Sequence, residues 1–185
     1  MDCLAALKEE GKVRAIGISN VSIEQLDRYR VAGELTSHQF RYSMLFRAPE
    51  DDVLPYCAEH NVAGICYLSL EQGLLTGKVG PDRIFNAKDW RANAEQWLPW
   101  FRRENRQKLL DMFAGWQDLL EHHNCTIAQL VIAWTSAQPG ATHILCGLRT
   151  AEQGIEAAGA AAILLSQSDV PVSYTHLTLP TILLV

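Results

Sequence analysis

Apolar residues along the chain follow two periods, and each period predicts a different element. Short runs rich in apolar and β-branched residues, typical of buried strands, occur at residues 13–19, 37–42, 62–68 and 142–147. Between them, apolar positions recur at helical spacing and predict helices over residues 22–30, 50–60, 108–122, 126–136 and 150–163. A strand followed by a helix, four times over, predicts an α/β fold with a parallel sheet.

Three of these helices begin with Ser/Thr-x-x-Gln, the pattern of a capping box. The pairs are Ser22 with Gln25, Thr126 with Gln129 and Thr150 with Gln153. The first three strands start about 25 residues apart, as in a repeated βα unit, whereas residues 69–105 delay the fourth. That segment is too long for a plain connection and is predicted to be a functional loop. The pattern leaves open a small four-stranded sheet and half of an eight-stranded barrel.

Composition narrows the classes of partner. The 185 residues are 48% hydrophobic and 20% charged, which is enough apolar mass for one globular domain. The net charge of −5 argues against nucleic acid and an anionic membrane as partners. No run of about 18 apolar residues predicts a membrane span, and the first residues lack the pattern of a signal peptide. Five scattered cysteines predict reduced thiols, most of them in the core, and a cytoplasmic protein.

Five motifs, in the same order along the chain, resemble the aldo-keto reductase family. They are residues 7–20, 67–78 (Tyr-Leu-Ser-Leu-Glu-Gln-Gly-Leu-Leu-Thr-Gly-Lys), 89–91, 128–134 and 147–153. The resemblance covers residues 1 to about 169 and implies the second half, strands five to eight, of a (β/α)8 TIM barrel as one domain over residues 1–170. No catalytic residue is assigned, because the family's catalytic Asp, Tyr, Lys and His belong to the first four strands.

The resemblance implies an NADP(H)-dependent oxidoreductase that acts on a small-molecule carbonyl or alcohol substrate. It reduces aldehydes and ketones, or oxidises alcohols, by hydride transfer. The chain itself is expected to supply most of the cofactor-binding residues and to be inactive alone. Two alternatives stay open: a non-catalytic half-barrel module that binds a nucleotide or assembles with another chain, and an unrelated α/β enzyme with an open four-stranded sheet.

The nicotinamide end of the cofactor is expected to lie where the first three strands end. By resemblance, Ser19 and Asn20 hydrogen-bond the carboxamide, and Gln39, in the second strand, is a further partner for it. Tyr67 ends the third strand, and its ring is expected to stack on the nicotinamide face. The alternatives are ordinary: Ser and Asn are turn formers, Gln39 can pair across strands, and a strand tyrosine is commonly a core residue.

The diphosphate is expected to contact the segment that follows the third strand. Residues 70–73, including Leu70, Gln72 and Gly73, are predicted to curl around it, and Lys78 to supply a positive charge. Leu68 and Ser69 are also assigned to this contact, although the family has Ser and Pro there. A backbone contact survives that change, whereas a hydroxyl contact from position 68 does not.

The adenosine end is expected at the start of the last helix. Gly147 and Arg149 close the fourth strand, and Arg149 suits the 2′-phosphate of NADPH. Gln153 matches an adenosine-phosphate position and is also half of a capping box, so both roles stay open. Glu156 matches an adenine-contacting position of the family. Ala157 replaces the usual Asn there, which removes one adenine hydrogen bond.

Two further groups of residues are weighed against ordinary roles. His122 and His123 are adjacent on a helix and point in different directions, so no metal is predicted. Aromatic residues between positions 97 and 101 are expected to line an apolar substrate pocket in the loop over the barrel mouth. Arg91 either reaches the diphosphate or pairs with an acid.

The end of the chain has a different character. Residues 172–181 resemble, residue for residue, one translated reading frame of a widely used transposon sequencing adaptor. Residues 171–185 are therefore interpreted as a non-native tail and are left out of the fold prediction.

Overall fold

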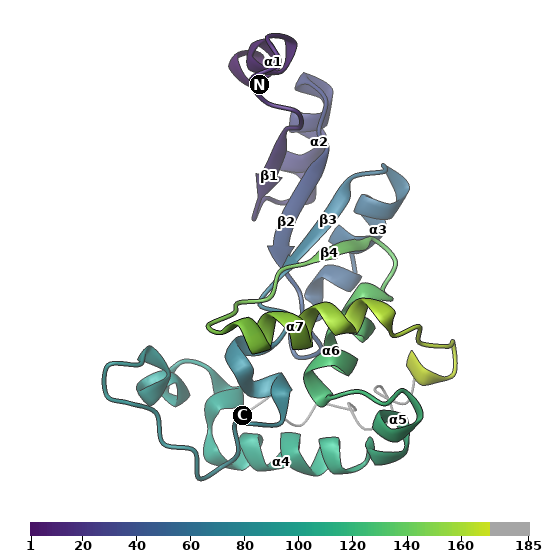
Figure 1. Ribbon diagram of the computed structural model, residues 1–185. Coiled ribbons are helices and arrows are strands. Elements are labelled where there is room, and N and C mark those ends of the chain that lie inside the picture. Colours follow the sequence, from purple (N-terminus) through teal and green to yellow (C-terminus); the bar gives the residue numbers. More distant parts are fainter. Residues whose placement is uncertain (171–185) are drawn as a thin grey trace. The chain divides into compact units, whose positions relative to one another are not determined.

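A computed structural model describes residues 1–170, so the predicted tail over residues 171–185 lies outside the described residues. The described chain contains a four-stranded sheet with the order β1-β2-β3-β4 (Figure 1). The strands are β1 (Gly17–Ser19), β2 (Ser37–Arg41), β3 (Ala63–Tyr67) and β4 (Ala141–Ile144). Each neighbouring pair is parallel. The predicted α/β fold with a parallel sheet is confirmed.

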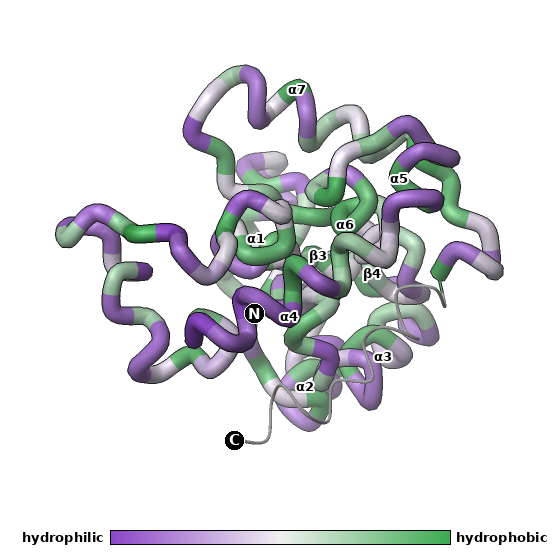
Figure 2. The backbone as a smooth tube through the Cα atoms, turned by 90° about the horizontal axis from the view of Figure 1, so that it is seen from below, coloured by the Kyte–Doolittle hydropathy of each residue, from purple (hydrophilic) through white to green (hydrophobic). Residues whose placement is uncertain are grey.

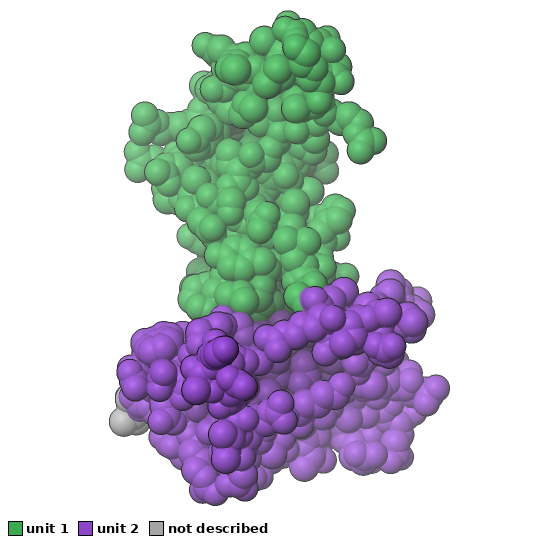
Figure 3. Space-filling view, turned by 60° about the vertical axis from the view of Figure 1, so that its left-hand side comes forward, with its two compact units in different colours: residues 1–69, 135–147 green, residues 70–134, 148–185 purple. Residues whose placement is uncertain are grey.

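The chain divides into two compact units, which Figure 3 colours separately. Unit 1 comprises residues 1–69 and 135–147 and contains the sheet. Its helices are α1 (Asp2–Glu9), α2 (Ile23–Ala32) and α3 (Val53–Glu59). Unit 2 comprises residues 70–134 and the described residues after position 147. It contains α4 (Arg103–Ala114), α5 (Gln117–His122), most of α6 (Ile127–Ser136) and α7 (Ala151–Gly159).

The core of unit 1 lies between one face of the sheet and helices α2 and α3. Burial alternates along β2 and β3, as expected for a sheet with one covered face, and Phe40 and Cys66 are buried there. Leu26 of α2 is also fully buried. The two helices are joined by Tyr56, whose hydroxyl donates to Oδ1 of Asp27 at 2.7 Å. Helices α2 and α3 therefore cover one face of the sheet (Figure 1).

The core of unit 2 is built from the apolar stripes of α4 and α6. Leu109 and Phe113 of α4 are buried, and Val131 and Trp134 of α6 are almost inaccessible. Figure 2 shows α6 as a largely apolar segment. No helix within residues 1–170 has the length and apolar character needed to cross a membrane.

Two of the three predicted capping boxes form completely. The N–H of Gln25 donates to Oγ of Ser22, and the N–H of Ser22 donates to Oε1 of Gln25. Thr126 and Gln129 make the same reciprocal pair. At the start of α7, Thr150 caps the N–H of Gln153, but the Gln153 side chain accepts from a different donor, the N–H of Arg149. The sequence pattern therefore located all three helix starts.

Several predicted boundaries are wrong. The helix predicted over residues 108–122 is two helices, because α4 ends at Ala114 with Gly115 as its C-cap and α5 begins at Gln117. The strand predicted over residues 13–19 begins only at Gly17, since β2 offers its first ladder partner there, Ser37. The strand predicted over residues 142–147 spans Ala141–Ile144, and the Leu145 N–H donates one further hydrogen bond to the Cys66 carbonyl.

The helices predicted over residues 50–60 and 150–163 are also shorter than expected. The first begins at Val53 after a separate 3₁₀ turn over Ala48–Glu50. The second ends at Gly159, where a 3₁₀ turn over Ala160–Ala162 follows. The long segment before α4 is not unstructured, because it contains 3₁₀ turns over Glu71–Thr76, Trp90–Gln96 and Pro99–Phe101.

Candidate functional site

Polar side chains gather at one edge of the sheet in unit 1. Ser19 ends β1 and is the register partner of Gln39 in β2, while Tyr67 ends β3. The Tyr67 hydroxyl donates a hydrogen bond of 2.8 Å to Oδ1 of Asn20, and the Asn20 backbone N–H donates to the Gln39 carbonyl at 2.9 Å. Because the strands are parallel, their carboxyl ends share this edge, where ligands bind in folds of this class.

The same cluster offers paired donors and acceptors. Nδ2 of Asn20 donates to the Ser19 hydroxyl at 3.0 Å. Ser19 and Asn20 are exposed, whereas Gln39 and Tyr67 are half-buried. Asn20 has a φ of 55°, a left-handed conformation that Asn adopts more readily than most residues. These groups form an amide-and-hydroxyl surface that suits a planar carboxamide.

The two residues after β3 turn the chain away from the sheet. Leu68 has a φ of 58°, so its own conformation makes the turn. Ser69 is 1% exposed, and its hydroxyl lies 3.5 Å from the Leu145 carbonyl oxygen, to which it donates. The hydroxyl of Ser69 therefore ties the end of β3 to the segment after β4. A ligand contact from the backbone at positions 68 and 69 stays a prediction.

The segment from Leu70 to Lys78 in unit 2 is a tight loop with unusual backbone angles. Glu71, Gln72 and Gly73 have consecutive positive φ values of 41°, 56° and 101°. Backbone N–H groups near such left-handed turns can form concave anion sites. Oε1 of Gln72 is buried and has no hydrogen-bond partner among the described residues. Thus the loop predicted to hold a diphosphate carries an unsatisfied polar atom.

Arg91 braces this loop. Its Nη1 donates to the Gln72 carbonyl at 2.9 Å, and its Nε and Nη2 donate to the Asp89 carboxylate. These charge-assisted bonds hold the pKa of Asp89 at about 2, below its usual value. Of the two roles open from the sequence, pairing with an acid is therefore present. The brace on Gln72 was missed, because no sequence pattern shows that a backbone carbonyl and a distant arginine meet.

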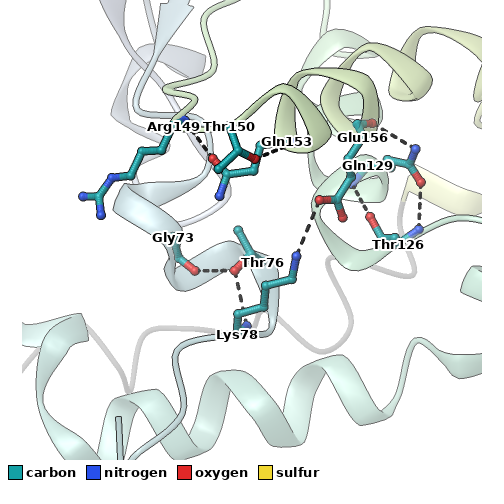
Figure 4. A network of polar contacts seen from close by, with 9 residues as sticks. All are labelled: Gly73, Thr76, Lys78, Thr126, Gln129, Arg149, Thr150, Gln153 and Glu156. Atoms are coloured by element: carbon teal, nitrogen blue, oxygen red, sulfur yellow. Dashed lines mark hydrogen bonds and ion pairs between the residues drawn. The ribbon is translucent and has the colours of Figure 1, made fainter. Parts of the chain in front are cut away.

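Lys78 and Glu156 connect the loop to α7 (Figure 4). Nζ of Lys78 lies 3.5 Å from Oε2 of Glu156, and the lysine side chain is 71% exposed. Thr76 fixes the loop itself, since its hydroxyl donates to the Gly73 carbonyl at 2.7 Å and accepts from the Lys78 N–H. Gln129 of α6 donates to the Glu156 carbonyl at 2.9 Å. Two predicted site residues, Lys78 and Glu156, are therefore in direct contact.

Arg149 lies just before the start of α7 and is exposed. The Arg149 guanidinium points away from the other labelled side chains in Figure 4 and makes no hydrogen bond or ion pair within residues 1–170. Oε1 of Gln153 accepts from the Arg149 N–H, so this side chain helps to fix the start of α7, and its contact with an adenosine phosphate stays a prediction. A free cation beside a helix N-terminus is an arrangement suited to a phosphate group.

Gly147 has open space around it. A Cβ built at this position would meet nothing within 4 Å, so packing in the described residues does not require glycine here. Within residues 1–170, no three His, Cys, Asp or Glu side chains come together in a way that could hold a metal ion. Nε2 of His123 instead lies 3.3 Å from Oδ2 of Asp169.

Known proteins resemble the chain over most of its length. It is 41% identical over 166 residues to the NADH-specific methylglyoxal reductase of Escherichia coli, covering 90% of this chain and 49% of the relative. It is 33% identical over 149 residues to aldo-keto reductase YhdN of Bacillus subtilis, covering 80% and 44%. The chain thus spans about half the length of the curated relatives it matches.

Solved structures show the same relationship. A glycerol dehydrogenase from Gluconobacter oxydans matches with a TM-score of 0.84 at 30% identity, over 94% of this chain and 52% of that one. An aldo-keto reductase from Bacillus halodurans matches with a TM-score of 0.66 at 18% identity, over 95% and 54%, which is a likeness of fold alone. The Aldo/keto reductase family model matches residues 1–172. The chain therefore belongs to the aldo/keto reductase family.

Proposed function

We propose that the chain is strands five to eight of an NADP(H)-dependent carbonyl reductase barrel and carries most of its cofactor-binding residues. The observation that supports this best is the hydrogen-bonded cluster of Ser19, Asn20 and Tyr67 at the carboxyl edge of a parallel sheet. In a family member, that edge is where a nicotinamide would be held. Small aldehydes, ketones or the corresponding alcohols are the proposed substrates.

Two groups of residues are proposed to bind different parts of the cofactor. In unit 1, Ser19 and Asn20 orient the carboxamide, and the Tyr67 ring, held at its hydroxyl by Asn20, covers one face of the nicotinamide. In unit 2, the loop around Gln72 and the side chain of Lys78 meet the diphosphate. The bound cofactor supplies the hydride, while the protein supplies orientation and charge.

The preference for NADP(H) rests on Arg149. Its unpaired guanidinium at the start of α7 is a suitable partner for a 2′-phosphate, which only NADP(H) carries. The names of the relatives differ on this point, since one is NADH-specific and one from Schizosaccharomyces pombe is labelled NADP(+). We therefore base the preference for NADP(H) on Arg149 and not on the relatives.

A hybrid barrel tests the proposed function. The chain is joined behind the first half of the Escherichia coli relative, and NADPH binding and NADPH oxidation with a simple aldehyde are measured for the hybrid and for the chain alone. We expect weak or no NADPH binding and no turnover by the chain alone, because no proton donor is placed opposite the nicotinamide. We expect the hybrid both to bind NADPH and to oxidise it with the aldehyde. Steady turnover by the chain alone, or a folded hybrid that binds neither cofactor, contradicts the proposal.

Two variants of the hybrid test the assigned residues. Tyr67→Leu is expected to lower NADPH affinity, whereas Tyr29→Leu, a half-exposed tyrosine of α2, is not. Arg149→Met is expected to lower affinity for NADPH about tenfold relative to NADH, because a charge-assisted phosphate contact is lost. Arg103→Met, which removes an exposed arginine paired with Asp82, is the matched control. An equal effect of Arg149→Met on both cofactors contradicts the NADP(H) assignment.

A further inference from the structure

Arg106, in the first turns of α4, is a buried charge without a counter-ion. The residue is 8% exposed, and its Nη1 donates to the carbonyls of Gly80 and Arg83, each at 3.0 Å. Its Nε is buried and has no hydrogen-bond partner among the described residues. No acidic side chain in residues 1–170 pairs with it. A buried guanidinium that bonds only to neutral carbonyls is costly, so an anionic partner for Arg106 would be stabilising.

Arg106 lines a cavity of about 230 Å³ that lies wholly within unit 2. Arg83 and Arg91 line the same cavity, and Glu95 is its one acidic lining residue. Asp89 already neutralises Arg91, whereas Glu95 makes no ion pair within the described chain. Even with Glu95 ionised, the lining retains net positive charge in a protein whose overall charge is −5.

The rest of the cavity wall is apolar and aromatic. Phe85 and Phe101 both line it, with ring centroids 6.2 Å apart, and Ile84 is a third apolar neighbour. The Arg91 guanidinium lies 4.6 Å from the centre of the Phe85 ring, which fixes that ring in place. Rings and charge therefore line the same small cavity, and the cavity is smaller than the roughly 300–1,000 Å³ typical of drug-sized ligands.

We propose that this cavity binds a small organic carboxylate, with its anionic group on Arg106 and Arg83 and a short apolar body against Phe85 and Phe101. The carboxylate supplies the negative partner that Arg106 lacks among the described side chains. The planar guanidinium also matches the planar carboxylate group. Inorganic phosphate satisfies the charge but leaves the aromatic wall unused. None of the residues proposed to hold the cofactor lines this cavity. The site is thus distinct from the proposed cofactor contacts, although Arg91, which braces the loop around Gln72, also lines the cavity.

Ligand binding to the full 185-residue chain tests this site without cofactor or turnover. The probes are benzoate, its neutral analogue benzamide and inorganic phosphate, each measured by isothermal titration and by the shift in unfolding temperature. We expect benzoate to bind and to raise the unfolding temperature, and the affinity to exceed that of either other probe at least tenfold. Benzamide binding as tightly as benzoate overturns the anionic site, and phosphate binding as tightly overturns the role of the aromatic wall.

Three variants assign any benzoate binding to the cavity. Arg106→Met keeps the length of the side chain and removes its charge, and it is expected to lower benzoate affinity at least tenfold. Because Arg106 is buried, Arg83→Gln provides a second test at an exposed position and is expected to lower affinity about threefold. Arg103→Gln is the control on the same helix, since Arg103 is exposed and does not line the cavity. Unchanged affinity in folded Arg106→Met or in Arg83→Gln overturns the proposal, as does an equal loss in Arg103→Gln.

Discussion

Asp89 and Arg91 are paired with each other, and Arg91 also bonds to the loop of residues 70–78, to which neither residue belongs. The carboxylate of Asp89 accepts from Nε and Nη2 of Arg91, which leaves Nη1 directed at the Gln72 carbonyl. Both side chains are largely shielded from solvent. Such pairs contribute more than exposed ones because water screens them less. Asp89 therefore helps to orient the arginine that bonds to the Gln72 carbonyl.

The pH dependence of Asp89→Asn follows from its lowered pKa. Because the folded pKa of about 2 lies below the unfolded value near 3.8, the carboxylate stabilises the fold above about pH 4 and loses this effect as the pH falls towards 2. We expect the variant to be less stable than the parent at pH 7, and the difference to shrink below pH 4. Urea unfolding at several pH values measures it. Asp82→Asn, in an exposed ion pair, is the control and should change little.

The five cysteines differ in reactivity because they differ in burial. Cys57 and Cys66 are buried, and desolvation raises the pKa of Cys57 to about 11 and that of Cys66 to about 12. Cys3 is exposed. At pH 8 we expect iodoacetamide to modify Cys3 readily, and Cys57 and Cys66 only after denaturation, as read by peptide mass spectrometry. Rapid labelling of Cys66 in the folded chain would contradict its place in the core.

Residue roles were predictable from sequence where a local motif carries them. Ser22 and Thr126 were identified as helix caps because their partners lie three residues away. The hydrogen bond from Tyr67 to Asn20 was not predictable, because 47 positions separate the two residues and only the sheet brings them together. The burial of Arg106 was not predictable either, since it results from the fold of the segment before α4.

At the scale of elements, the chain just before β4 passes close to β3 and to α3, at two glycines. A Cβ built on Gly64 would lie 2.0 Å from the Gly140 carbonyl oxygen, and one on Gly140 would lie 2.2 Å from the Leu54 carbonyl oxygen. Gly140 also has a φ of 90°. The register between β3 and β4 shifts between Gly64 and Ile65. The absence of side chains at these positions allows β4 to join the sheet.

Gly64→Ala tests this approach. The added methyl group collides with backbone atoms that cannot rotate away, so we expect a loss of about 3 kcal/mol in the free energy of unfolding. Gly147→Ala is the matched control, because nothing lies within 4 Å of its built Cβ, and we expect a change below about 0.5 kcal/mol. Urea unfolding monitored by circular dichroism compares the two. Equal midpoints for Gly64→Ala and the parent would contradict the described packing.

The kinds of element were predictable, and several of their ends were not. The apolar stripe continues through residues 108–122, so periodicity alone predicts one helix, yet Gly115 and the buried Trp116 separate α4 from α5. Strand ends depend on the neighbouring strand, as at Gly17, where pairing begins only when β2 supplies Ser37. The pattern of apolar residues indicates which positions are buried. The end of a helix or strand depends instead on where its last backbone hydrogen-bond partner lies.

At the scale of the whole molecule, the parallel direction of the strands followed from the repeated βα pattern. The division into two compact units did not, because the second unit interrupts the first between positions 69 and 135 and no composition change marks either boundary. Within the described chain, β1 and β4 are the outer strands of the sheet. Outer strands present N–H and C=O groups that can pair with another chain.

We expect the purified chain to self-associate through these outer strands. Sedimentation velocity over a range of concentrations measures it, with the hybrid barrel as a comparison in which the added half supplies neighbours for both strands. His143→Lys places a charge on exposed β4 and is expected to weaken association. Gln107→Lys adds the same charge on the exposed surface of α4 and should have no effect. A chain that remains monomeric at every concentration would contradict this expectation.

The interrupted course of unit 1 has a consequence for synthesis on the ribosome. Strands β1, β2 and β3 are near one another in sequence and can pair as soon as residue 69 has emerged, because loop closure between them is short. β4 follows only after residues 70–134 have been translated. Throughout that interval the outer side of β3 is uncovered in the nascent chain. The translation of unit 2 therefore sets the time for which a folding chaperone would have to protect this strand.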